Sequence, residues 1–383
     1  MNDTKSHHFS TIDILKGVAI WMVILVHSRQ TFQNLAPWLK VFDIGQMGCQ
    51  IFFVISGLST MMSFERLELQ EHSLRKFYKK RLMAIIPGWY TAIFFVYILN
   101  SISLILDGDT IGFAVNRQPL SILCNLLLIH GFLPFCNNDV YAGGWFVGTI
   151  AIFYLIAPFI YKFLRQNKRV PIRYIPWIAQ TIACIVIIGI YLLKDDMTLA
   201  KYGFAYFSFV NQIGCFLLGT ILYVKLKDYE TLKDNLYLRK ILCVVYLVLL
   251  FYMFFSKWIY FSVLVSFTMG LFTYNLLICM ISTEIRTRHV FEKSVIWNIL
   301  KNYGLHSYYI YLIHFLFVWT IPFKLQKIFL ILDVQIDDNI VYSIWIIPIF
   351  VFSYYAALLF EKIVVTIQSS LRKLCSSFRI YKT

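Results

Sequence analysis

Three ionisable side chains share one apolar segment near the start of the chain. Asp13, Lys16 and His27 lie in or beside a run of mostly aliphatic residues. A histidine near neutral pH can take a proton from a hydroxyl group and return it to a leaving group. We therefore expect His27 to act as a general base. Asp13, three residues before Lys16, is placed to orient or neutralise that lysine on a helix.

The spacing of the two basic residues places them on nearly the same helix face. His27 follows Lys16 by about three turns, which is about 16 Å along the axis and about half the hydrocarbon thickness of a bilayer. Exposing Lys16 to mid-bilayer lipid would cost on the order of 2.5 kcal/mol or more, so this face should meet a protein interior or a wet cavity. In the alternative, Lys16 snorkels to the near surface, His27 merely sits at the far end, and Asp13 is a helix N-terminal charge.

The elements that must position these residues are membrane spans. Of the 383 residues, 59 % are hydrophobic and 14 % are charged, whereas soluble proteins carry about 25 % charged residues. The composition predicts an all-α, polytopic transmembrane helical bundle that forms a single membrane-embedded domain over residues 1–383. The ten spans expected from apolar length are residues 12–29, 44–64, 83–106, 142–164, 174–193, 203–224, 239–256, 258–281, 304–323 and 341–362.

A shorter apolar run covers residues 119–134, and charge decides whether it crosses. The basic clusters within 75–81 and 165–173 should both be cytoplasmic, because positive residues collect on that side. An even number of crossings must separate them, yet three apolar runs lie between. Residues 119–134 are therefore predicted to be re-entrant or interfacial, and both termini are predicted to be cytoplasmic.

The net charge of +15 also reflects the excess of basic residues in the loops assigned to the cytoplasm. The basic residues occur in short loops between apolar runs, which argues for membrane lipid and against nucleic acid as a partner. The cysteines lie mostly within apolar segments without Cys-x-x-Cys spacing, so we expect packing residues and no metal site. The sequence is compatible with a homo-oligomer and does not demand one.

Several motifs resemble those of the acyltransferase family 3 membrane proteins. In chain order they are Asp-x-x-Lys-Gly-x-Ala-Ile from Asp13 with His27 eleven residues after the lysine, Phe-Phe-x-x-Ser-Gly ending at Ser56 and Gly57, the basic pair Lys80 and Arg81 ahead of Pro87, the segment from Trp145 through Tyr154 to Pro158, and Ser-x-x-x-Tyr-Leu-x-His from Ser307 to His314. The order and spacing of these motifs are more specific than any one of them.

The resemblance implies an O-acyltransferase of a bacterial cytoplasmic (inner) membrane. Such proteins move acyl groups, usually acetyl, from acetyl-CoA to sugars of surface polysaccharides. By this resemblance acetyl-CoA, or a related acyl-CoA, is the co-substrate, and a glycan or lipid-linked sugar is the acceptor. His27, with Lys16 and Asp13, would be catalytic. The donor would bind at Lys80, Arg81, Ser56 and Gly57, and Trp145, Tyr154 and His314 are further candidates.

Each of these assignments has a structural alternative. Ser56-Gly57 is a small patch suited to helix packing, and Lys80-Arg81 suits a topology signal that touches anionic lipid. His314 also suits a satisfied packing histidine inside a span.

Two positions depart from the family pattern. Leu58 stands where an aromatic residue is usual, and Ile150 stands where many members have glutamate. If family members use that glutamate as a charge partner for the histidine, the partner in this chain must come from elsewhere. The difference points either to a branch of the family that lacks this carboxylate or to altered activity. A polysaccharide or acyl-group exporter without catalysis is the main alternative, and a polytopic scaffold is another. Direct transfer and a transient acyl-histidine both stay open.

Overall fold

Long helices joined by short connections make up the chain. The computed structural model describes residues 9–32, 34–108, 118–133, 136–166, 171–194, 203–227, 235–256, 261–287, 294–333 and 336–380. These residues contain no β-strand, so the predicted all-α class is confirmed. Ten helical stretches are long and apolar enough to cross a membrane. This confirms the polytopic bundle predicted from apolar length.

The first part of the chain supplies four of the candidate spans. Its elements are α1 (Ser10–Gln30), η1 (Pro37–Met47), α2 (Gly48–Glu68), α3 (Ser73–Asp107), α4 (Pro119–Leu126), η2 (His130–Phe132) and α5 (Gly144–Gln166). Helix α3 begins at Ser73 rather than at the expected residue 83. Lysine and arginine are good helix formers, so the basic loop continues directly into the apolar helix.

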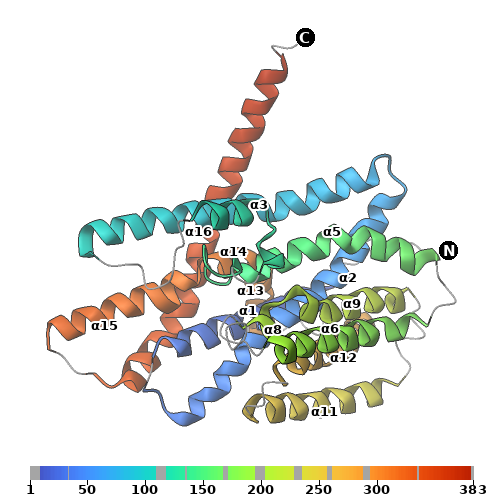
Figure 1. Ribbon diagram of the computed structural model, residues 1–383, viewed down its shortest axis with the longest axis horizontal. Helices are drawn as coiled ribbons and strands as arrows, with labels where there is room; N and C mark the ends of the chain where they lie inside the picture. The colour runs from blue at the N-terminus through green and yellow to red at the C-terminus, as the bar shows by residue number, and fades with distance from the viewer. Residues whose placement is uncertain are drawn as a thin grey trace.

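The second part supplies the other six. Its elements are η4 (Ile172–Tyr174), α6 (Ile175–Lys194), α8 (Phe204–Phe207), α9 (Phe209–Leu226), α11 (Leu236–Phe255), α12 (Phe261–Thr287), α13 (Val295–Leu305), α14 (Ser307–Ile313), the π-helical turn η5 (Leu316–Thr320), α15 (Ile321–Ile331) and α16 (Asp338–Ile380). The C-terminal part of α16 projects away from the other helices (Figure 1).

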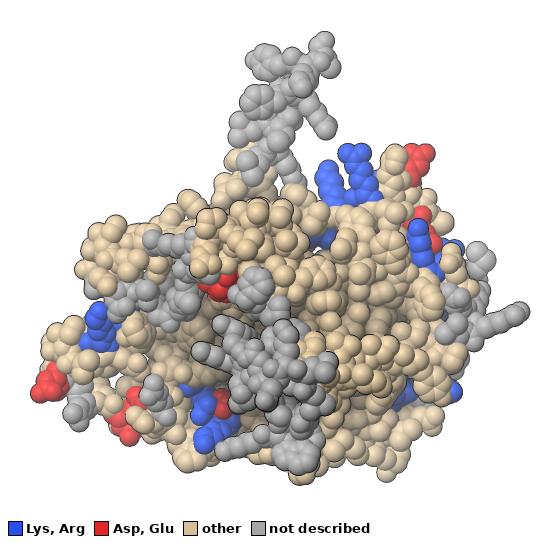
Figure 2. Space-filling model, viewed as in Figure 1, with Lys and Arg blue, Asp and Glu red and all other residues tan. Residues whose placement is uncertain are grey.

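Ion pairs join helix ends that the charge pattern assigns to one side. Glu68 at the end of α2 pairs with Arg165 at the end of α5, and Glu65 pairs with Lys227 after α9 at 2.5 Å. The loops assigned to the cytoplasm are thus neighbours in space. Figure 2 shows most of the visible charged side chains toward the left and right sides of the view.

Residues 119–133 form a short helix and a turn that stop within the bundle. The eight residues of α4 span about 12 Å, too little to cross a bilayer. The indole of Trp89, midway along α3, donates a hydrogen bond to the Asn125 carbonyl at 3.2 Å and stacks on His130 at 5.6 Å. The segment therefore packs beside the middle of a spanning helix, as expected for a re-entrant element.

Helix α1 lies inside the bundle, against α2, η1 and α13 (Figure 1). Its contact with α13 is close because Gly17 faces the Leu300 backbone, and Gly304 faces the Asp13 backbone. A Cβ built on Gly17 would lie 1.9 Å from the Leu300 oxygen, and one on Gly304 1.7 Å from the Asp13 oxygen. The Lys16-Gly17 pair thus combines a polar side chain with a site of backbone contact.

Candidate active site

His27 lies in the last turn of α1 and lines a cavity of about 360 Å³. Six parts of the chain form the wall: α1, η1 with the start of α2, the turn before α5 with the start of α5, α8, α14, and the segment that follows α14. The lining residues are Val23, Val26, His27, Gln30, Gln46, Cys49, Asn138, Ala142, Gly143, Trp145, Tyr206, Phe207, Tyr311, Phe315 and Trp319. The predicted base therefore faces a hollow between these elements.

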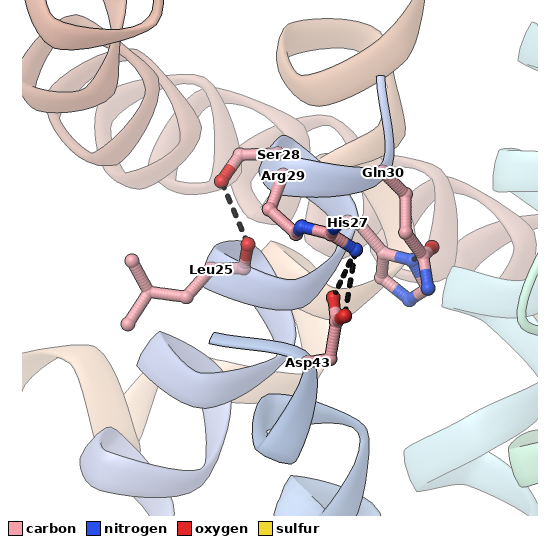
Figure 3. Close-up of polar contacts among 6 residues, drawn as sticks. All are labelled: Leu25, His27, Ser28, Arg29, Gln30 and Asp43. Carbon is pink, nitrogen blue, oxygen red and sulfur yellow. Dashed lines mark hydrogen bonds and ion pairs between the residues drawn. The ribbon is translucent and has the colours of Figure 1, made fainter. Parts of the chain in front are cut away.

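The imidazole of His27 is oriented by a neighbour on its own helix. Its Nδ1 lies 3.0 Å from Oε1 of Gln30, and Figure 3 shows the two side chains next to each other. With that oxygen as acceptor, Nδ1 carries the hydrogen and Nε2 keeps the lone pair. The neutral ring thus has a basic nitrogen for a substrate proton.

Contacts on both sides fix the turn that carries His27. The guanidinium of Arg29 pairs with both carboxylate oxygens of Asp43 on η1, at 2.8 and 2.6 Å (Figure 3). The indole of Trp319 donates to the His27 carbonyl at 3.1 Å, and Thr31 donates to the Val318 carbonyl at 2.5 Å. The backbone of α1 is therefore tied to η1 and to the π-helical turn η5.

His314 lies directly beside His27. It is completely buried, and its Nδ1 donates to the Tyr311 carbonyl at 2.8 Å. The two imidazole rings are 5.4 Å apart, and the buried Nε2 of His314 has no hydrogen-bond partner among the described residues. The π-helical turn η5 begins two residues later, and such turns frequently mark functional sites. The structure thus brings two sequence candidates from distant spans together.

Aromatic rings also line the cavity. Trp145, another sequence candidate, lies against Tyr206 at 5.5 Å and Phe207 at 5.2 Å. Three amide side chains that line the cavity, Gln30, Gln46 and Asn138, were not predicted from the sequence. Asn138 accepts the Trp145 backbone N–H on its Oδ1 at 3.4 Å. Its position in a turn just before an expected span was a usable signal, because such turns border the membrane surface.

Lys16 and Asp13 lie together at the opposite end of α1. The ammonium of Lys16 lies 3.2 Å from Oδ1 of Asp13, and the Asp13 carboxylate is buried. Lys16 is not among the residues that line the His27 cavity. Ile20, one turn after Lys16 on the same face, is completely buried. Apolar packing thus separates the two polar ends of this face.

Arg81 and Tyr154 form a second junction of sequence candidates. The guanidinium of Arg81 lies 4.8 Å from the centre of the Tyr154 ring and donates to the Ser59 carbonyl at 3.1 Å. Lys80 is exposed. Tyr154 follows Trp145 by nine residues on α5, so this junction lies about 13 Å along the helix from the His27 cavity.

Gly57 lies at a helix crossing. A Cβ on it would meet the Phe216 carbonyl of α9 at 2.1 Å, so its packing role is visible in the structure. Ser56 is half-buried and lies one turn before Ser59, the residue that accepts the Arg81 hydrogen bond. The two residues therefore differ: Gly57 supports the fold, and Ser56 lies near the Arg81 junction.

The position of Ile150 also has a structural account. Its side chain is buried in the main apolar core. The described residues that line the His27 cavity include no carboxylate, and the ring is oriented by the Gln30 amide instead. In the described part of the chain, no group of three or more His, Cys, Asp or Glu side chains could hold a metal ion.

The family model of the acyltransferase domain, acyltransferase family 3, matches residues 9–362. The chain belongs to this family. The match extends from the start of α1 into α16 and includes His27 of the cavity and the neighbouring His314. No curated protein and no solved structure matches the chain. Family membership supports a multi-pass membrane acyltransferase.

Proposed function

We propose that this acyltransferase moves an acetyl group from cytoplasmic acetyl-CoA to a sugar hydroxyl on the outer side of a bacterial inner membrane. The observation that carries the proposal is the His27 ring, oriented through Nδ1 by Gln30, at the wall of an internal cavity. The acceptor class is a surface or lipid-linked polysaccharide. In this proposal, acceptor and donor meet at the His27 ring.

The proposed reaction has two proton transfers at one nitrogen. His27 Nε2 takes the acceptor hydroxyl proton while the oxygen attacks the thioester carbonyl, forming a C–O bond and a tetrahedral oxyanion. The carbon–sulfur bond then breaks, and the CoA thiolate takes the proton from His27. The products are the O-acetyl ester and free CoA, and His27 returns to its neutral form.

The cavity supplies a donor for the oxyanion. Asn138 uses its side-chain oxygen for the Trp145 N–H, which leaves its NH₂ group for a ligand in the cavity that it lines. A hydrogen bond that strengthens as negative charge develops on the thioester oxygen lowers the barrier. Trp145, Tyr206 and Phe207 supply the flat apolar surfaces on which sugar rings pack.

Acetyl-CoA suits the separation between the two junctions. Its phosphates lie at one end of a long flexible arm and its thioester at the other. Arg81 and Lys80 would hold the phosphate end with Ser56 close by, while the arm extends along the length of α5 toward His27. Lys16, paired with Asp13 near the cytoplasmic end of α1, is proposed to attract the negatively charged donor.

The decisive experiment compares His27→Ala with the wild-type chain. Membranes that contain each protein receive acetyl-CoA, and release of the CoA thiol is measured together with the masses of surface glycans and lipid-linked sugars. We expect an acetyl-sized mass shift with the wild-type chain and a loss of about 100-fold or more in the variant. His72→Gln, at an exposed histidine outside the cavity, is the matched control and should retain the shift.

Three other outcomes have definite meanings. Full activity of a folded His27→Ala protein would remove His27 from the mechanism. Glycan export that depends on the chain without CoA release would favour the exporter. An acetyl group recovered on the His27 peptide after a rapid quench would establish the covalent route, and its absence under steady turnover would favour direct transfer.

A further inference from the structure

A second, larger cavity lies at the edge of the bundle, between α6, α9, α11 and α12. Its volume is about 680 Å³, and it shares no lining residue with the His27 cavity. The lining residues are Arg173, Tyr174, Pro176, Trp177, Leu218, Ile221, Val224, Lys225, Asn235, Arg239, Leu242, Tyr246, Leu271, Tyr274 and Asn275. Figure 1 shows these four helices side by side, with α11 outermost.

One end of this cavity is cationic. Arg173, Lys225 and Arg239 come from three different elements, and none of the described residues that line the cavity is acidic. The charged groups of Lys225 and Arg239 each lie 5.8 Å from the centre of the Tyr274 ring. Arg239 also donates to the buried Asn275 amide oxygen at 2.9 Å. Three converging cations without a lining carboxylate suit a phosphate group.

The rest of the cavity is apolar and reaches the outer surface of the bundle. Leu218, Ile221 and Leu271 form a buried wall, and the Trp177 side chain is 47 % exposed at the rim. Helix α11 is only 6 % buried over its apolar window, so its outer face meets the surroundings of the bundle. In a bilayer those surroundings are lipid chains.

The cationic end lies on the side assigned to the cytoplasm. Lys227, two residues after Lys225, pairs with Glu65 at the end of α2, and this end of α2 adjoins the basic start of α3. Anionic lipids concentrate in the cytoplasmic leaflet, and basic pockets between spanning helices on that side bind their headgroups. A water-soluble phosphate would bind the cations but would leave the apolar wall without a contact.

We propose that this cavity binds an anionic glycerophospholipid of the cytoplasmic leaflet. The phosphate lies among Arg173, Lys225 and Arg239, and an acyl chain follows Trp177, Leu218 and Leu271 between α6 and α11. The site is separate from the His27 cavity and does not depend on the proposed acyl transfer. Binding would tie the peripheral helix α11 to the more deeply buried helices α9 and α12.

The test uses tail-brominated lipids, which quench tryptophan fluorescence on contact. The purified full-length chain is titrated in mixed micelles with brominated phosphatidylglycerol or brominated phosphatidylcholine. Comparison with Trp177→Phe gives the part of the quenching that comes from Trp177. This quenching should reach its midpoint at a several-fold lower mole fraction of brominated phosphatidylglycerol than of brominated phosphatidylcholine. Arg239→Gln and Lys225→Gln should each weaken that preference by about fivefold, because each cation contributes roughly one charge–headgroup interaction.

Lys227→Gln is the matched control. It removes a cation from the same end of the bundle, but that cation is paired with Glu65 and lines a different pocket. Arg239→Lys retains the charge and should bind almost as well as the wild-type chain, which separates lipid binding from folding.

Equal quenching by the two lipids would overturn the proposal. If Lys227→Gln and Arg239→Gln weakened the preference for the anionic lipid equally, the preference would come from general surface charge and the proposal would be wrong. Displacement of the lipid by inorganic phosphate or CoA at matched ionic strength would assign the cations to a soluble ligand instead.

Discussion

The rings of His27 and His314 lie 5.4 Å apart and inclined by 36°, although 286 positions separate them in the chain. Phe315 also lies close to both, at 4.7 Å from His27 and 4.1 Å from His314. His314 is held through Nδ1 by its own helix. Any movement of α14 and η5 therefore moves the wall against which the His27 ring rests.

His314→Gln is expected to lower kcat by about tenfold, which corresponds to about 1.4 kcal/mol of transition-state stabilisation, with little change in the KM for acetyl-CoA. Glutamine keeps a polar group at this buried position, whereas His314→Ala leaves a cavity and should lower the free energy of unfolding more. Steady-state kinetics and the thermal midpoint of the purified variants check this. A fall in the midpoint with unchanged kcat per folded molecule would mean that His314 only packs.

Gln30→Leu is expected to lower kcat by about three- to tenfold. The change removes one neutral hydrogen bond, worth about 1 kcal/mol, that selects the His27 tautomer. Gln70→Leu serves as the control, because Gln70 is exposed and bonds only near the α2–α3 connection. Unchanged kcat in Gln30→Leu would show that the tautomer is fixed by other means.

Arg81→Ala is expected to raise the KM for acetyl-CoA about tenfold, because a charge-assisted hydrogen bond to a phosphate contributes about 1.5 kcal/mol or more. Arg81 also packs on Tyr154 and bonds to Ser59, so the thermal midpoint should be measured in parallel. Lys80→Gln, at an exposed position, should raise the KM less and only at low salt. A lower midpoint with an unchanged KM would leave Arg81 as a structural anchor.

Gly304→Ala is expected to destabilise the bundle by about 1–3 kcal/mol, because the added methyl group collides with the Asp13 carbonyl. Gly189→Ala is the matched control within another helix, since a Cβ there meets nothing within 4 Å. Thermal unfolding in detergent should separate the two. Equal thermal midpoints for Gly304→Ala and Gly189→Ala would mean that α1 and α13 can move apart without loss of stability.

The sequence was informative wherever a physical constraint acts along the chain. Apolar length predicted the ten spans, and charge asymmetry predicted that residues 119–134 do not cross. The helical period predicted that Lys16 and His27 share a face. The structure confirms the span count, and it adds that Ile20 is packed between the two residues.

What the sequence could not predict depends on contacts between distant segments. The approach of His314 to His27 results from the packing of α14 on α1, which no local pattern specifies. Gln30 and Asn138 lie outside the compared motifs, so their place at the cavity emerged only in three dimensions. In the sequence, Gly57 suits both helix packing and a ligand site, and the structure shows that it packs on α9.

Ile20 has a consequence for the electrical insulation of the membrane. An open column of water from Lys16 to His27, ending at an imidazole, would be a route for proton leakage down the electrochemical gradient of the cell. Because Ile20 is completely buried on this face between Lys16 and His27, such a column is interrupted there. The proposed chemistry at His27 therefore does not require an open path for protons along this helix.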